Sequence, residues 1–523
     1  ALPNTGYQQL DWINKMMFKI NDYWRLTSNT QYSTTSNIPR FDKLNDTDYN
    51  SGACEICGMV MPKYMYWYYG PQNRFFSSLN LQGYKKNKLF DRSEFILAYQ
   101  EVTESRNQQK LEDDSLTIRR EVVDVFSLNT NFKKGNFSYG SEAIINFVES
   151  TSNLYEAHSV SGVIPTLGAT RYPSGGSYLI SNALYLNYFK NFNEKIQLET
   201  GIRSTFCSLQ ATFADTIARD PLGISGTTIN SNNHIFSGNI KVTYYPNKSW
   251  KISSVTSKGF HSPNIDDMGK LFVKGDNITI PNPELNPEYA YSQEISISKE
   301  IGNNFLIYGT AFYTQIEDAI IKDTMWVNLN SNPPPGSNPD PFWANQVIYE
   351  NVIKYTFANQ NLGKAKVYGY TLGLEVRLFN NYKLYSDINF TKSRNEQGRG
   401  PLAHIPPTFG KVFIEREIGK FQFSFDIRYA LKKGVDEYDD AGVDNIEESP
   451  ISNILYSENG EESIIYAGSP KWETINLNCN YAINNKTSIQ LSLNNLLDKH
   501  YKVFASGISA PGRSFVITLR IKN

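Results

Sequence analysis

Apolar and polar side chains alternate with a period of two along three runs within residues 474–523. The apolar members are Ile475, Leu477, Cys479 and Tyr481, then Ile489, Leu491 and Leu493, and finally Phe515, Ile517, Leu519 and Ile521. Strict period two predicts β-strands with one apolar face and one polar face. The polar face is rich in amides, so we expect it to meet water rather than a packed core. Such a sheet suits a membrane barrel with an aqueous lumen.

The same alternation recurs upstream. Aromatic and aliphatic residues at 421, 423, 425, 427 and 429 alternate with Gln422, Ser424, Asp426 and Arg428. Arg203 also alternates with apolar neighbours in a strand that we expect from Lys195 to Leu209 and that carries Cys207. Charged side chains at inward positions predict a wet lumen, because charge on the lipid face of a barrel is costly.

Tight turns and long irregular segments alternate between the expected strands. The turn-forming stretches are 21–22, 133–136, 191–194, 246–249, 302–304, 380–381, 419–420 and 484–486. The long segments run over 39–69, 150–178, 214–233, 261–288, 322–364 and 434–472. Short turns on one side with long extracellular loops on the other are typical of outer-membrane barrels. A string of soluble β-sandwiches would have no reason to keep this alternation.

The count of hairpins predicts about nineteen strands, each long enough to cross a membrane at a tilt. The first, over residues 6–19, and the last both run toward the tight-turn side. Because a single-chain bacterial barrel usually has an even number of strands, we expect an incomplete barrel. Open edges are not tolerated in lipid, so we expect a missing N-terminal piece to pair with the closing strand.

Composition narrows the alternatives. The chain has 523 residues, is 40% hydrophobic and 14% aromatic, and has a net charge of −1. No stretch approaches the run of about 18 apolar residues that a membrane helix needs, and aromatic richness fits the two girdles of a barrel. Near-neutral charge argues against a nucleic-acid partner. No signal peptide is visible at Ala1, so we expect that the gene starts upstream.

Several motifs resemble the barrel of TonB-dependent outer-membrane receptors, particularly the haem and haemoglobin-receptor-like branch common in Bacteroidota. The first box is Phe260, His261, Ser262 and Pro263, and the second is Asn282, Pro283, Glu284 and Leu285. Residues 361–369, 494–499 and 507–515 resemble further signatures, as do 4–7, 38–42 and 69–72. The resemblance therefore covers essentially the whole chain, 1–523.

The resemblance implies an all-β transmembrane antiparallel barrel of 22 strands with a plug domain. About nineteen of these strands would lie in this chain, and the plug and first strands would be absent. It further implies TonB-dependent, energised uptake of a metal chelate such as haem or a siderophore across the outer membrane of a Gram-negative bacterium. The implied partners are the plug piece, the TonB-type energy-coupling complex, outer-membrane lipids and a surface lipoprotein. Haem or a chelate would be the transported ligand, with no tightly bound cofactor.

The chain departs from the family pattern at two positions. The second residue of the first box is usually Arg and is His261 here, and the final residue, usually aromatic, is Asn523. No His lies between the two boxes, where this branch often carries one, and this absence weakens haem as the ligand.

Haem would need an axial ligand such as His or Tyr. His261, His158 and His404 are our candidates because they fall in or beside predicted extracellular loops. A loop histidine is more often simply solvated or hydrogen-bonded. Pro263 and the Asn282–Pro283 pair are interpreted as loop-shaping residues.

Cys54 and Cys57 precede Met59 and Met61 in a predicted extracellular loop. A local disulfide is the ordinary interpretation in an oxidising compartment. Soft sulfur ligands could instead suit copper(I), but a lone pair without a second cluster is weak evidence, and we expect no resident metal.

Three classes of function stay open. The first is an energised transporter; the second is a barrel scaffold or receptor subunit of an outer-membrane complex without transport; the third is a passive porin. Catalysis is not expected, because the five histidines fall in separate loops and no nucleophile–base pair can be assembled.

Overall fold

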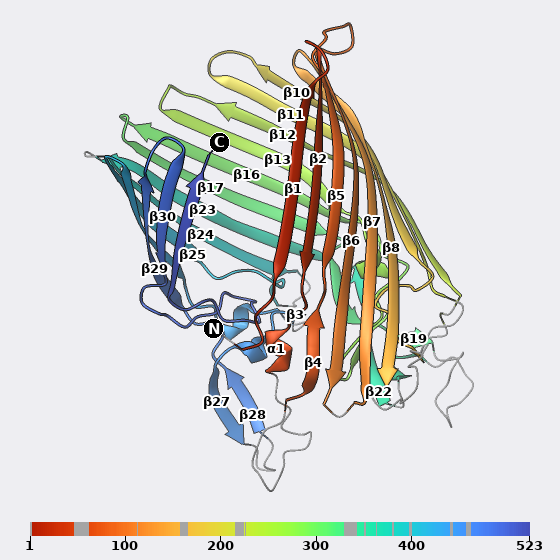
Figure 1. The fold of residues 1–523 in the computed structure, drawn as a ribbon. Helices are drawn as coiled ribbons and strands as arrows, with labels where there is room; N and C mark the ends of the chain where they lie inside the picture. The colour runs from red at the N-terminus through yellow and green to blue at the C-terminus, as the bar shows by residue number, and fades with distance from the viewer. Residues whose placement is uncertain are drawn as a thin grey trace.

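The computed structural model describes residues 3–45, 62–111, 113–156, 166–214, 224, 226–328, 343–349, 352–361, 363–378, 381–396, 400–439, 443–456 and 462–522. Its main sheet contains 22 strands within these ranges, of which β3, β4 and β9 are short additions at the loop side, leaving nineteen long strands (22 − 3). Each long strand pairs antiparallel with the next long strand along the chain, so the sheet is a simple meander that curves around a central space (Figure 1). The predicted all-β antiparallel architecture and strand count are confirmed.

The long strands divide into two halves of the meander. The first half consists of β1 (Gln9–Lys19), β2 (Trp24–Thr35), β5 (Asn73–Gly83), β6 (Arg92–Lys110), β7 (Ser115–Lys134), β8 (Phe137–Glu156), β10 (Ser177–Asn191), β11 (Ile196–Thr212) and β12 (Thr228–Tyr244). The second half consists of β13 (Trp250–His261), β16 (Glu288–Ile301), β17 (Phe305–Glu317), β23 (Lys364–Leu378), β24 (Tyr382–Asn395), β25 (Phe409–Ile418), β26 (Phe421–Ala430), β29 (Trp472–Ala482), β30 (Thr487–Asn494) and β31 (Ser514–Ile521).

The two outermost strands of the meander are β1 and β31. β1 pairs with β2, β31 pairs with β30, and within the described residues no ladder joins β1 to β31. Both strands run toward the tight-turn side, which is the upper side in Figure 1. Each therefore presents one backbone edge that the described residues leave unpaired.

Connections on the turn side are short, as predicted. They include the turns at 20–23, 135–136, 192–195, 245–249, 302–304, 419–420 and 483–486. Positive φ angles at Gly135, Gly302, Asn381 and Gly419 explain why Gly and Asn occupy these turns, since other residues are strained there. Two connections differ from the expected alternation. Residues 84–91 form a longer turn-side link, and residues 111–114 a short loop-side link.

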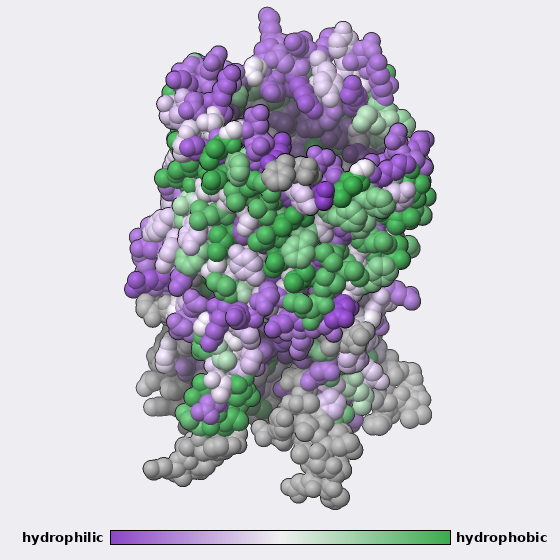
Figure 2. All heavy atoms as spheres, turned by 90° about the vertical axis from the view of Figure 1, so that its left-hand side faces the viewer, coloured by the Kyte–Doolittle hydropathy of each residue, from purple (hydrophilic) through white to green (hydrophobic). Residues whose placement is uncertain are grey.

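The in–out alternation of side chains gives the sheet its two faces. Large apolar residues such as Leu184, Ile202 and Phe236 are 61–67% exposed on one face of the sheet. Figure 2 shows a band of hydrophobic residues across the outside of the wall on the side that faces the viewer. The opposite face of β25, β26 and β29–β31 lines a space of 470 Å³ with Glu415, Gln422, Asp426, Arg428, Asn478, Asn480, Gln490 and Arg520 among its residues. The predicted polar inner face is therefore present.

The wall differs in height around the sheet. β6, β7 and β8 have 19, 20 and 20 residues, whereas β29, β30 and β31 have 11, 8 and 8. Roughly ten residues are enough to cross a membrane. The loop-side halves of β6–β8, which we call the tall wall, therefore project well beyond the apolar band, and residues 150–156, expected in a loop, continue β8.

The loop side carries small elements of its own. They are α1 (Phe41–Leu44), α2 (Ile265–Met268), β3 (Ile38–Pro39), β4 (Tyr64–Tyr69), β9 (Thr166–Leu167), β14 (Phe272–Lys274), β15 (Asn277–Thr279), β18 (Ile320–Thr324), β19 (Val327–Asn328), β20 (Trp343–Ala344), β21 (Gln346–Tyr349), β22 (Val352–Asn361), β27 (Ile451–Tyr456), β28 (Glu462–Tyr466), η2 (Val435–Glu437) and η3 (Ile446–Glu448). Five of them, β14, β15, β18, β21 and β22, form a separate sheet with a small core around Ile278, Val347 and Ala358. In the described ranges, no helix has the length and apolar character required to cross a bilayer.

Candidate functional site

The first family box forms the exit of β13 into helix α2. Phe260 and His261 still pair with Tyr289 and Glu288 of β16. Pro263 is fully buried, and Asn264 then caps α2, accepting hydrogen bonds from the backbone N–H groups of its second and third residues. The Asp267 carboxylate accepts from the Asn264 backbone N–H and completes a capping box.

His261 is tied to this cap. Its Nε2 lies 2.9 Å from Oδ2 of Asp267, while about half of the side chain remains exposed. The hydrogen bond to the Asp267 carboxylate raises the pKa of His261. This nitrogen is therefore already engaged, and the imidazole is oriented by the helix cap.

The second family box packs against α2 from the other side. The Asn282 backbone N–H donates to the Met268 carbonyl (3.0 Å), and the Asn282 side chain donates to the carbonyl of Asn359 on β22 (2.7 Å). Asn359 in turn donates from its side chain to the Asp267 carbonyl (3.1 Å). Two parts of the connection between β13 and β16 are thus joined to β22 by the side-chain amides of Asn282 and Asn359. We call this set, Asp267, Asn282 and Asn359, the amide clip.

The clip rests on the inner surface of the barrel. Leu285 of the second box and Met268 of α2 are buried against Leu209, Ala211 and Ile229 of β11 and β12. Full burial of a Leu or Met side chain contributes roughly 1.5–3 kcal/mol each. The boxes therefore hold the loop layer against the wall.

Three arginines gather where the tall wall meets the loop layer: Arg106 on β6 and Arg119 on β7 belong to the wall, and Arg171 lies between β9 and β10. Arg171 pairs with Asp266 of α2 at 3.0 Å, Arg106 pairs with Glu104 at 3.3 Å, and the Arg119 Nε donates to the Ala169 carbonyl at 3.1 Å. We call Arg106, Arg119 and Arg171 the arginine group.

Glu121 lies in the field of the arginine group and is 7% exposed. Neither of its carboxylate oxygens has a hydrogen-bond partner among the described residues. Burial raises the pKa of Glu121, against the opposing charges of the arginines. Three arginines and three carboxylates, Glu104, Glu121 and Asp266, thus lie close together here.

His404 lies in a different loop, between β24 and β25. Its Nδ1 is 3.1 Å from Oδ1 of Asp444, and its backbone N–H donates to the same oxygen at 2.8 Å. Asp444 and Lys433 are nearly inaccessible, with their charged atoms 4.0 Å apart. His404 and His261 therefore each pair with their own aspartate on separate loop segments.

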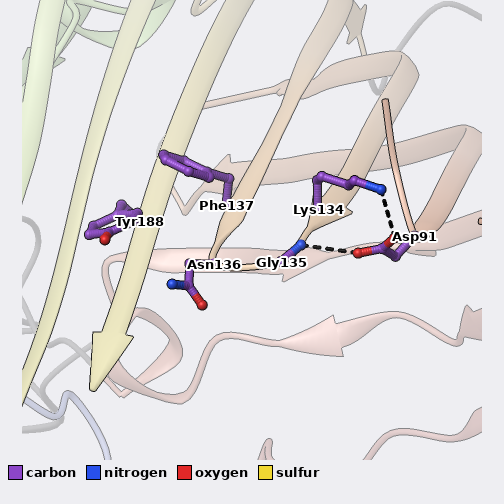
Figure 3. Close-up of a pocket in the computed structure, with 6 residues that line it drawn as sticks. All are labelled: Asp91, Lys134, Gly135, Asn136, Phe137 and Tyr188. Carbon is purple, nitrogen blue, oxygen red and sulfur yellow. Dashed lines mark hydrogen bonds and ion pairs between the residues drawn. The ribbon is translucent and has the colours of Figure 1, made fainter. Parts of the chain in front are cut away.

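A second kind of site lies on the turn side. Figure 3 shows a groove of 610 Å³ in which Lys134 and the Gly135 N–H both reach the Asp91 carboxylate, at 2.9 and 3.1 Å. Beside them the Phe137 and Tyr188 rings lie with centroids 4.8 Å apart and planes inclined at 43°. Phe137 belongs to the exposed apolar face, so this groove marks the rim of the membrane band, where aromatic residues gather.

The predicted candidates differ in how far the structure describes them. His261, His404 and all residues of the two boxes are placed; His158, Cys54 and Cys57 lie outside the described residues, so their predicted roles stay predictions. Within the described part of the chain, no group of three or more His, Cys, Asp or Glu side chains is arranged to hold a metal ion. The residues missed at the level of sequence are Asn359, Asp267, Asp444, Lys433 and the arginine group. Of these, only Asp267 had a local signal, because it stands three residues after the capping Asn264.

Comparison with known families gives a match over nearly the whole chain. The family described as "TonB dependent receptor-like, beta-barrel" matches residues 3–496.

Two characterised relatives align over 279 residues each. The "Iron-regulated outer membrane virulence protein" of Vibrio cholerae is 21% identical, across 52% of this chain and 37% of the relative. The "Probable hemoglobin and hemoglobin-haptoglobin-binding protein 4" of Haemophilus influenzae is 22% identical, across 51% of this chain and 25% of the relative. The matches thus span well under half of these relatives' lengths.

Solved structures share the fold at low identity. The copper transporter OprC superposes with a TM-score of 0.69 at 11% identity, covering 98% of this chain and 72% of that one. The ferric yersiniabactin uptake receptor FyuA of Yersinia pestis gives 0.64 at 13% identity, covering 99% and 72%. With the family match, these place the chain plainly: it belongs to the TonB dependent receptor-like, beta-barrel family, whose members reside in the outer membrane of Gram-negative bacteria.

Proposed function

We propose that this chain forms the barrel of a receptor that takes up a metal chelate, such as haem or a siderophore, across the outer membrane with TonB-derived energy. The observation that carries the proposal is the family match over residues 3–496 together with a barrel wall of nineteen long strands whose inner face is polar. A barrel of this size encloses a lumen that must be plugged to prevent leakage. Uptake through it therefore needs a plug and an energy source.

The haem and haemoglobin-receptor-like branch, of the type common in Bacteroidota, is the finer part of this proposal. The relatives named for iron regulation and haemoglobin binding support it, as does the pair of boxes that frame α2. His261, His404 and His158 are the proposed axial ligands. An absorbance titration of the purified receptor with haemin tests this version. A Soret shift that is lost in His261→Ala or His158→Ala supports it, and no shift, or one unchanged in both variants, rejects haem ligation by these residues.

We also propose that additional strands pair with the free edges of β1 and β31, and that a plug domain occupies the lumen. Unpaired backbone groups facing hydrocarbon are costly, which is why barrels in membranes close. The piece would belong to the same polypeptide or to a separate chain. Cysteine pairs placed on β31 and on the candidate strand test the pairing. An efficient disulfide in the outer membrane supports it, and a direct crosslink between β31 and β1 contradicts it.

Energised transport can be separated from the two other classes. Uptake of radiolabelled iron chelate that requires both the barrel and the energy-coupling protein supports transport. A steady ohmic conductance of the purified complete protein in planar bilayers indicates a passive porin. Partner capture without any uptake indicates a scaffold or receptor subunit, with a surface lipoprotein as the proposed partner.

A further inference from the structure

A pocket of 420 Å³ lies on the loop side between two connections, residues 431–471 after β26 and residues 495–513 after β30. Small-molecule sites typically have volumes of about 300–1,000 Å³ and are lined by aromatic side chains with a few polar groups. The pocket is separate from the amide clip and the arginine group, and it contains none of the three predicted histidine ligands.

Four aromatic side chains line this pocket. Trp472 and Tyr501 lie with ring centroids 4.4 Å apart and planes inclined at 33°, and Tyr438 meets Phe504 edge to face at 5.4 Å. Such a lining offers flat apolar surface to an aromatic ligand, with an additional stacking contribution beyond simple burial.

The charge of the lining is positive once its ion pairs are counted. Glu448 pairs with Lys502 at 3.3 Å, and Asp444 is shared by His404 and Lys433. Lys471 and Lys499 also line the pocket, and among the described residues no carboxylate lies within ion-pairing distance of either ammonium group. Two uncompensated positive charges beside a partly enclosed aromatic surface favour a ligand that carries negative charge.

The pocket is held in shape by a buried lysine. Lys433 is 2% exposed; its ammonium group donates to the Ile405 carbonyl and lies 3.8 Å from the centroid of the Phe504 ring. It therefore joins three loop-side connections, those after β24, β26 and β30. A pocket already organised without ligand loses less conformational entropy on binding.

We propose that this pocket binds an iron chelate that combines aromatic rings with carboxylate or phenolate charge. The inference rests on the proposed uptake function and names the substrate class for it. Haem, with its carboxylates, and a ferric catecholate are the two sources of this chemistry. The lining also includes His500, whose Nε2 bonds the Ser509 hydroxyl at 2.8 Å, and Tyr501, both of which are chemically able to ligate iron. For haem bound in this pocket they take the place of the three histidine candidates, which lie outside its lining.

The experiment uses the complete purified receptor in detergent and follows tryptophan fluorescence quenching by haemin, by a ferric catecholate and by a neutral ferric trihydroxamate. Trp472→Ala and the double variant Lys471→Gln/Lys499→Gln should each weaken binding of the preferred anionic chelate about tenfold. Lys432→Gln and Trp326→Ala, which alter loop-side residues outside the pocket lining, serve as matched controls and should bind as the unaltered receptor does. Haemin and the catecholate are titrated in separate arms, and the chelate that binds with the higher affinity identifies the source.

Several outcomes overturn the inference. They are no binding of either anionic chelate, unchanged affinity in both pocket variants, or equal weakening by the controls. Heat-modifiable gel migration verifies that each variant has a folded barrel, and Lys471→Arg/Lys499→Arg should restore binding. Chelate uptake by living cells is measured separately. Binding without energised uptake would reject the proposed function while leaving the pocket assigned, and uptake with unaltered binding in the variants would do the reverse.

Discussion

The tall wall and the wall formed by β29–β31 differ in the interactions that hold the structure outside the membrane. At about 3.3 Å per residue, the strands of β7 and β8, with 20 residues each, reach far past the membrane, and their backbone ladder continues to their ends. β30 and β31 have 8 residues each and end near the rim. Beyond them, the buried Lys433–Asp444 pair and the Phe504 ring organise the loops. Structure outside the membrane therefore relies on a long main-chain ladder in the tall wall, and on buried side chains beside the short β27–β28 ladder above β29–β31.

Asp444→Ala gives the largest expected effect on this comparison. The change leaves the Lys433 ammonium buried without its partner, which costs about 3–5 kcal/mol when a buried pair is broken. Hydrogen exchange should accelerate across the described parts of residues 431–471 and leave β7 and β8 unchanged. Asp436→Ala, an exposed acid of the same connection, is the control. Equal acceleration in the tall wall would contradict the division.

Asn282→Ala tests the segment that lies between the two walls. The substitution removes the side-chain bond to the partly buried Asn359 carbonyl, at a cost of about 0.5–1.5 kcal/mol. Proteolysis within the connection between β13 and β16 should become faster. Asn277→Ala, at an exposed position in the same connection, should be neutral; comparable damage from both variants would mean that the amide clip has no special role.

Glu121 provides a pH test of the tall wall. Its pKa is raised by burial above the ordinary 4.5, so the folded state binds more protons than the unfolded state just above pH 4.5. Stability therefore falls as pH rises through this window. Glu121→Gln should remove this slope and stabilise the wall at neutral pH. Urea unfolding midpoints at several pH values give the measurement, with the exposed Glu149→Gln as control. If the slope of stability against pH is unchanged in Glu121→Gln, the arginine charges cancel the effect of burial on the Glu121 carboxylate.

His261→Gln gives the smallest expected effect. Unlike Glu121, which is neutral when protonated, His261 is charged when protonated. Its pKa is raised above 6.5 by Asp267, so its contribution is complete below pH 6.5 and is lost as pH rises through the higher folded-state pKa. Because the side chain is half exposed, the contribution is about 0.5–1 kcal/mol. His261→Gln should flatten the pH dependence of exchange in α2, whereas His234→Gln on β12 should not. A pH dependence that survives in His261→Gln would assign it to another group.

Most of the membrane-crossing wall could be predicted from the sequence. The alternation around residues 421–429 and 475–521 is strict because one face meets lipid and the other water, and Gly or Asn in the turns is required by positive φ. The loop-side half of β7 is harder to identify, because outside the membrane neither face meets lipid and no apolar alternation is required; Arg119, Arg120 and Glu121 are three consecutive charged residues.

The contacts of the candidate sites could not be predicted for a different reason. Asn359 bonds the Asp267 carbonyl across 92 residues, and the ring above Lys433 comes from Phe504. Pairings over such distances depend on how the strands are ordered in space. By contrast, the boxes are recognisable from the motif alone. The cap that follows the first box is predictable because Asn264 and Asp267 stand three residues apart.

The unequal walls also determine how the barrel bears force. A pull directed along the barrel axis loads neighbouring strands partly in shear, and many hydrogen bonds must then break together. β7 and β8 share a register of 20 residue pairs, so this seam is mechanically stiff. Within the described residues, the connection that carries Lys433 has a ladder of only five residue pairs, between β27 and β28, so fewer hydrogen bonds resist separation there. Under load the two sides therefore respond differently: the tall wall resists separation of its strands, and the loops around the pocket above β29–β31 separate first.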